Sequence, residues 1–219
     1  MPLKFAASTG APKRWRRLAR LVLCIAIATA AGARSAVAQL HAVPIKDPSA
    51  VYELEGYSVQ PPPGPGWFEM QRDRHLAMFG RKVDSPTHSF GATATSDSIN
   101  EKFETREQFR DYVNKYRTAE FDPARFKVLE FESALDDTQA AWCVRYHLKH
   151  TDRDAVLARN RILLVETFGI TCLHPEKNEV VVDVGYSERG RVAELKTDLS
   201  ASLRTEGESF IRSIRFGKR

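Results

Sequence analysis

Two cysteines and two histidines with metal-binding or redox potential lie in the second half of the chain: Cys143, His147, Cys172 and His174. Thiolates and imidazoles are ligands that zinc and copper prefer, and two thiols can also form a disulfide. If these residues lie on β-strands, four ligands would be spread over several residue rises of about 3.3 Å each. The chain has no Cys-x-x-Cys motif, which disfavours thioredoxin-like chemistry. A structural disulfide between Cys143 and Cys172 is therefore the preferred interpretation, with a metal site as the alternative.

The expected strands around the two cysteines provide an internal check on this pairing. Apolar periodicity predicts strands over residues 141–150 and 162–173, joined by a loop. If that loop closes a symmetric hairpin, Cys143 lies opposite Cys172, and Lys149 lies opposite Glu166. One register thus predicts both a disulfide and a cross-strand ion pair on the same face, and a shift of one residue would lose both.

Three polar residues within expected strands are the candidates for ligand binding: Arg145, His147 and Asp183. Arg145 and His147 would share a face with apolar residues of the next strand, where an arginine can recognise an anion. Asp183 interrupts a run of valines, and burial would shift the pKa of its carboxyl group. The alternative is ordinary packing, with the side chains of Arg145 and His147 reaching solvent at the sheet edge and Asp183 held by hydrogen bonds.

No catalytic motif is complete. Gly185–Gly190 resembles a nucleophile elbow around Ser187, but the second glycine comes one residue late and the last histidine, His174, precedes the serine. The pair Asp136-Asp137 between two strands is typical of a turn. No glycine-rich phosphate-binding loop follows a strand. We therefore predict no catalytic residue, no metal and no cofactor.

The first 38 residues have the parts of a secretory signal peptide. Basic residues precede the apolar run Leu21–Ala31, and Ala36-Val37-Ala38 supplies the small side chains that a signal peptidase accepts. The apolar run is shorter than the roughly 20 residues of a membrane-spanning helix. We predict cleavage between Ala38 and Gln39, and a periplasmic or secreted mature chain without a transmembrane segment.

Cleavage would remove the basic character of the chain. The whole chain has 33 Lys and Arg against 28 Asp and Glu, a net charge of +5. Seven of the basic residues and none of the acidic residues lie in residues 1–38, which leaves 26 basic and 28 acidic residues, a net charge of −2. A nucleic-acid-binding domain usually has a basic patch on its folded surface. We therefore expect no nucleic-acid partner.

Alternating apolar residues dominate the mature chain and predict an antiparallel sheet. The expected strands cover residues 57–60, 67–71, 75–82, 88–95, 126–131, 141–150, 162–173 and 180–187. Thr105 and Gln108 form a capping box that begins one helix. A second helix, slightly broken by Gly207, carries Leu199, Leu203, Phe210, Ile211 and Ile214. We predict an α+β fold, with a single curved antiparallel sheet covered by helices, in one domain over residues 55–219 after an irregular lead-in over residues 39–54.

This layout resembles the PsbP-like fold, named for an extrinsic photosystem II subunit and shared by a nuclear-import factor and several small bacterial envelope proteins. The matching features are Gly56–Val59 running into Pro65-Gly66-Trp67, the helix from Thr105, and the closing segment Phe210–Phe216. The resemblance covers roughly residues 55–216 and implies a curved antiparallel sheet covered by helices. It implies no shared activity, because members of this fold differ in their partners.

The combined features predict a non-catalytic domain of the periplasm or cell envelope that binds an unidentified ligand or envelope protein. The alternative is an exported, hydrolase-like enzyme whose site is assembled from Arg145, His147, Glu166 and Asp183. A polar-lined concavity around these residues would favour a small ligand, and a large exposed apolar patch would favour a protein partner. The sequence leaves the oligomeric state open.

We predict that the exported protein begins at Gln39, either unmodified or cyclised, because signal peptidase needs small residues before the cleaved bond. Intact-mass measurement and N-terminal sequencing of the exported protein will check this. Ala38→Phe is the matched control and should retain the leader. A wild-type protein that keeps residues 1–38, or carries a lipid on Cys24, would contradict both the cleavage and the charge argument.

Overall fold

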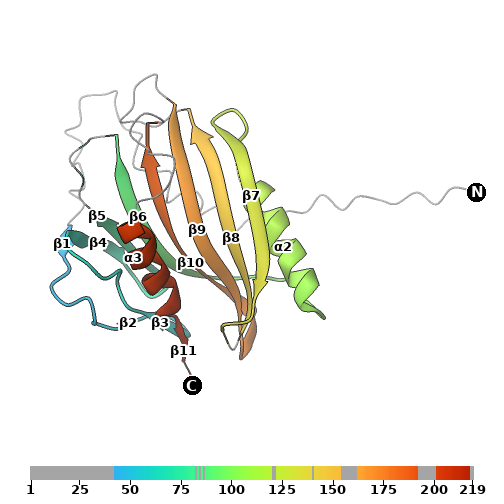
Figure 1. The fold of residues 1–219 in the computed structure, drawn as a ribbon. Coiled ribbons are helices and arrows are strands. Elements are labelled where there is room, and N and C mark those ends of the chain that lie inside the picture. Colours follow the sequence, from blue (N-terminus) through green and yellow to red (C-terminus); the bar gives the residue numbers. More distant parts are fainter. Residues whose placement is uncertain are drawn as a thin grey trace, which may run out of the picture. The chain divides into compact units, whose positions relative to one another are not determined.

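Long antiparallel strands make up most of the structure, a computed structural model (Figure 1). It describes residues 42–81, 83, 85, 87–119, 122–139, 141–153, 162–191 and 201–217. The predicted leader, its cleavage site at Ala38 and Gln39, and Leu199 of the expected C-terminal helix lie outside these residues.

The eight expected strands and the two expected helices occur in the expected order, and the described part has three further short strands that the sequence did not predict. The strands are β1 (Val43–Pro44), β2 (Tyr52–Glu53), β3 (Tyr57–Val59), β4 (Trp67–Arg72), β5 (Leu76–Arg81), β6 (Ser89–Ser98), β7 (Phe126–Asp136), β8 (Trp142–Asp152), β9 (Leu163–His174), β10 (Lys177–Gly190) and β11 (Arg215–Phe216). The helices of the described part are α2 (Arg106–Ala119) and α3 (Ala201–Arg212). The three further strands are β1, β2 and β11.

The strands form two antiparallel sheets. A large sheet has the order β1-β4-β5-β6-β10-β9-β8-β7, and a small sheet has the order β11-β3-β2. Within the large sheet, β7 to β10 follow one another as neighbours, and β10 returns beside β6 with Asp183 opposite Thr95. The small sheet joins the C-terminal β11 to the early β3, since Arg215 lies opposite Ser58.

The prediction of an α+β fold, with one curved sheet covered by helices, is wrong. Most of the described chain is strand, the strands form two sheets, and each described helix covers only part of one face. The physical reason is strand length. β7 to β10 run for 11 to 14 residues each, so the large sheet extends well beyond what helices of 14 and 12 residues can cover. The fold is mainly antiparallel β, and the resemblance to PsbP-like proteins stays a prediction.

The two helices pack on opposite faces of the large sheet. Arg145 of β8 forms an ion pair with Glu208 of α3, and Asp183 of β10 forms one with Arg117 of α2. Successive residues of a strand point to opposite faces, so these two pairs define an α3 face and an α2 face. Figure 1 shows α3 in front of the sheet near β6 and β10, and α2 beside β7.

The predicted register between β8 and β9 is confirmed. Cys143 lies opposite Cys172, and Lys149 lies opposite Glu166. The register follows from the apolar residues of both strands, because a shift of one position would move every side chain to the other face. β8 extends two residues beyond the expected range, to Asp152.

Thr105 caps α2 as the sequence predicts, whereas the Gln108 side chain bonds the residue before the cap and not Thr105 itself. The Thr105 hydroxyl accepts a hydrogen bond from the backbone N–H of Gln108 at 3.2 Å. The Gln108 side chain in turn accepts one from the backbone N–H of Glu104 at 2.7 Å. These bonds satisfy donors that would otherwise lack partners at a helix start. Phe109 and Val113 then bury one side of the helix.

The main hydrophobic core lies between α3, the small sheet and the α3 face. Its large buried side chains include Tyr57, Val59, Trp67, Phe79, Ile170, Val182, Val184, Tyr186, Leu203, Phe210, Ile211 and Ile214. The Phe79 and Phe210 rings meet edge to face with centroids 5.7 Å apart, an arrangement that adds to the stabilisation from burial alone.

Gly207 brings α3 unusually close to the sheet. The helix continues through this glycine, and a Cβ atom placed there would lie 2.3 Å from the Tyr186 ring. On one side of the glycine, Glu206 accepts hydrogen bonds from Trp67 and Arg81, each at 2.7 Å. The glycine is therefore a contact residue between helix and strand, although the sequence predicted a slight break.

Gly207→Ala should lower the free energy of unfolding by about 1–3 kcal/mol, because the new methyl group overlaps the Tyr186 ring. On a helix without this contact the same change would stabilise by about 1 kcal/mol. Urea denaturation of the mature protein measures the difference. In a Tyr186→Ala background, Gly207→Ala should become neutral or stabilising. Destabilisation of equal size in both backgrounds would contradict the close contact.

Candidate functional site

Arg145 joins β8 to both β7 and α3. Its Nε atom donates a hydrogen bond to Asp136 at 2.7 Å, and its Nη1 atom donates one to Glu208 at 2.9 Å. Burial by itself would raise the pKa of Asp136, but hydrogen bonds from Thr138 and Arg145 hold it below its usual value. The guanidinium group is thus engaged in structural ion pairs between three elements.

Tyr186 completes this network under α3. Its hydroxyl donates a hydrogen bond to Glu208 at 3.1 Å. Burial, and next the nearby Glu208 carboxylate, raise the pKa of Tyr186, so its hydroxyl stays protonated and available as a donor. Glu208 therefore connects α3 to β8 through Arg145 and to β10 through Tyr186.

Three aromatic rings run side by side from this network toward the exposed end of the α3 face. The rings of Tyr186 and Phe168 are stacked with centroids 5.6 Å apart, and those of Phe168 and His147 with centroids 4.3 Å apart. Tyr186 is buried, whereas Phe168 and His147 are half-buried. The Arg204 guanidinium of α3 lies over the Phe168 ring at 5.6 Å. The outer part of the row is accessible, and a cation already lies against it.

Charged side chains surround the outer ring of this row. His147 Nε2 forms a hydrogen bond with Glu166 at 2.8 Å, and its Nδ1 lies 3.9 Å from Glu130. Lys149 also approaches Glu166, at 3.9 Å. On β7, Glu132 lies directly opposite His147. We call this part of the α3 face the β7–β9 surface. It consists of Glu130, Glu132, His147, Lys149, Glu166 and Phe168.

Asp183 belongs to a separate network on the α2 face. It forms an ion pair with Arg117 and accepts hydrogen bonds from Thr171 at 3.0 Å and from Tyr146 at 3.2 Å. The Arg117 guanidinium also lies 4.1 Å from the centre of the Tyr146 ring. Burial alone would lower the pKa of Arg117, but the negative charge of Asp183 outweighs this effect and raises the pKa above its usual value. Arg117 therefore stays charged and holds α2 against the sheet.

The structure does not bring the three predicted ligand-binding residues together. Arg145 and His147 share the α3 face, and Asp183 lies on the α2 face. The set proposed for a hydrolase is divided in the same way, because Glu166 lies with His147 and away from Asp183. Sequence reasoning missed Glu130 and Glu132, and it treated Phe168, which is half-buried, only as an apolar neighbour of His147. A longer expected strand would have indicated Glu132, because residues 126–136 continue as strand up to the aspartate pair, whereas Glu130 already lies within the expected strand over residues 126–131.

Cys143 and Cys172 form the predicted disulfide. Both residues are fully buried, and oxidised sulfur atoms cannot supply the thiolates that the alternative Cys/His metal site requires. His174 is also buried, and its Nε2 lies 2.9 Å from the backbone oxygen of Gly56. The alternative metal site made of these two cysteines and two histidines is therefore not formed.

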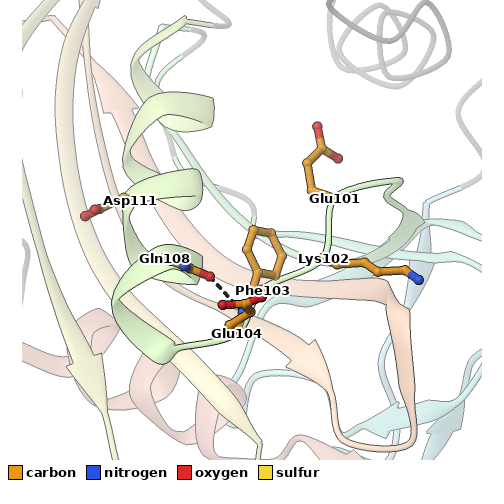
Figure 2. A pocket seen from close by; sticks show the side chains of 6 residues that line it. All are labelled: Glu101, Lys102, Phe103, Glu104, Gln108 and Asp111. Atoms are coloured by element: carbon orange, nitrogen blue, oxygen red, sulfur yellow. Dashed lines mark hydrogen bonds between the residues drawn. The ribbon is translucent and has the colours of Figure 1, made fainter.

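A shallow, open hollow lies where the chain enters α2 (Figure 2). Its lining consists of Glu101, Lys102, Phe103, Glu104, Gln108 and Asp111. Phe103 packs against Phe109 and Tyr112, with ring centroids 5.2 Å apart in each pair. The dashed line in Figure 2 is the hydrogen bond between Glu104 and Gln108 that begins the helix. These contacts explain the hollow as part of the helix cap.

No protein-family model and no curated protein matches this chain. Function is therefore inferred from the side chains and their contacts. Among the described residues, no helix is both long and apolar enough to cross a membrane.

We predict that the cleaved protein has no free thiol, because the disulfide contains both cysteines of the mature chain. The bond joins residues 29 positions apart, and closing such a loop stabilises by roughly 3–4 kcal/mol through the unfolded chain. Thiol titration of denatured, non-reduced protein and melting with and without reductant test this. The melting temperature of the Cys143→Ala/Cys172→Ala variant should be close to that of the reduced wild type and should not change when reductant is added. Two titratable thiols in the wild type would contradict the bond.

Proposed function

We propose that the mature chain is a non-catalytic binding domain of the periplasm or cell envelope, and that it binds a small ligand on the β7–β9 surface. The observation that carries the proposal is the ring row that ends at Phe168 and His147. A half-buried aromatic side chain with charges around it can contact the apolar part of a ligand, and the charges can orient its polar part.

The contacts of the polar strand residues favour binding over catalysis. Arg145 is paired with Asp136 and Glu208, and Asp183 is paired with Arg117 on the other face. Groups held in this way stabilise the packing of helices on the sheet. A hydrolase built from Arg145, His147, Glu166 and Asp183 would need them around one reacting atom, whereas the sheet separates them.

The mixed charge of the surface favours a small amphipathic ligand over a large apolar one. The cationic Arg204 lies over Phe168, the anionic Glu166 is bonded to His147, and the cationic Lys149 lies 3.9 Å from Glu166. The predicted leader and the disulfide support the compartment, because disulfides persist in oxidising surroundings. In the second form of this proposal, the partner form, the same surface binds an envelope protein instead of a small ligand.

Phe168→Ala should weaken ligand binding about tenfold, the effect of losing an aromatic contact worth roughly 1–1.5 kcal/mol. Native mass spectrometry of protein isolated from the periplasm should show a small molecule that denaturation releases, at lower occupancy in the variant. Phe126→Ala is the matched control, because Phe126 is also half-buried on a strand but contacts His150 on the α2 face.

Three results would count against this proposal: no releasable ligand, equal occupancy in both variants, or a ligand lost only in the control. Co-purification of one protein in stoichiometric amount, abolished by Phe168→Ala and kept by Phe126→Ala, would support the partner form. Melting temperatures of both variants must be measured, so that a loss of folding is not read as a loss of binding.

A further inference from the structure

Three side chains of metal-ligating type meet at one edge of the β7–β9 surface. Each of Glu130, Glu132 and His147 offers one ligand atom, and these atoms lie within 4.8 Å of one another. The arrangement follows from the strands. Glu132 is directly opposite His147, and Glu130 is two residues along the same strand and hence on the same face.

The imidazole of His147 is held in the orientation that a metal ligand needs. A carboxylate can only accept a hydrogen bond, so the bond between Glu166 and Nε2 places the proton on Nε2. In the neutral ring the lone pair is then on Nδ1, the atom that faces Glu130 at 3.9 Å. Stacking on Phe168, with ring planes 4° apart, fixes the ring further. A carboxylate behind the imidazole is the usual support of a metal-binding histidine.

The charge at this place also favours a cation. Glu130, Glu132 and Glu166 surround His147, and Lys149 is the cationic side chain next to Glu166. Glu132 is exposed, and none of the described residues forms an ion pair with it. A divalent ion would reduce the repulsion between carboxylates that lie side by side.

We propose that Glu130, Glu132 and His147 bind one divalent transition-metal ion, for which Zn²⁺ fits best, and that Glu166 orients His147. One nitrogen and two oxygen ligands suit zinc, and calcium or magnesium would prefer oxygen ligands alone. A tetrahedral ion at about 2.0–2.2 Å from each ligand needs ligand atoms about 3.4 Å apart. The glutamates would therefore move inward by about 1 Å, which exposed side chains can do. This inference rests on the proposed function, because it names a metal cation as one ligand of the proposed binding surface.

Calorimetric titration of metal-free, tag-free mature protein with Zn²⁺ should show one binding event per chain. Glu132→Gln and His147→Ala should each weaken it at least tenfold, and Glu166→Gln should weaken it by about 10- to 100-fold, as for other groups that support a metal ligand. His88→Ala is the matched control. His88 also pairs with a carboxylate, Glu188, at 2.6 Å, but it is outside the three-ligand group, so its loss should leave the affinity unchanged.

The proposal fails if the wild type does not bind Zn²⁺, or if Glu132→Gln and His147→Ala bind as tightly as the wild type. It also fails if His88→Ala weakens binding as much as they do. Two separate measurements on the wild type distinguish this inference from the proposed function: native mass spectrometry for a releasable small molecule and calorimetry for zinc. Zinc binding by a wild-type protein that carries no small-molecule ligand would support the metal site and count against the proposed function. A retained organic ligand without zinc binding would overturn only the metal site.

Discussion

The close contact between Gly207 and Tyr186 determines how α3 lies on the large sheet. A helix with any side chain at this position would be held away from the strand. At the distance that glycine allows, Glu206 reaches Arg81 on β5 and Glu208 reaches Arg145 on β8. These charge-assisted hydrogen bonds are partly shielded from water, where each contributes more than a neutral bond would. They fix α3 across the middle of the sheet and leave His147 and Phe168 half-exposed beside it.

The alternation of side chains along a strand explains why the polar residues divide into two networks. Arg145 lies on β8 and Asp183 on β10, with β9 between them, and their positions in the register differ by one, which places them on opposite faces. Each is paired with a charge from the helix on its own face. These two ion pairs therefore attach both helices to the sheet. They also keep Arg145 and Asp183 apart, and a catalytic arrangement of the two residues would leave Glu208 and Arg117 without these partners.

The sequence predicted local features well and the overall architecture poorly. The β8–β9 register could be deduced because a symmetric hairpin had to bring Cys143 opposite Cys172 and Lys149 opposite Glu166, and two independent pairs agreed. The start of α2 could be deduced because Thr105 and Gln108 form local hydrogen bonds. The extent of the sheet could not, because apolar periodicity gives no measure of how far strands pair beyond their apolar residues. Gly207 was misread for a similar reason: its role depends on Tyr186, a residue on another element.

The length of β7 explains why the candidate site could not be predicted from the sequence. Its apolar pattern weakens after Phe131, so a strand ending there is the natural interpretation, and Glu132 would then be in a turn. In the structure, pairing with β8 continues to Asp136, and Glu132 comes to lie opposite His147. β7 is also the last strand in the order of the large sheet, so its side chains can adjust with fewer neighbours to displace. A site made from an edge strand and an oriented histidine can thus combine adjustable carboxylates with one fixed ligand, and neither part is visible in the spacing of residues along the chain.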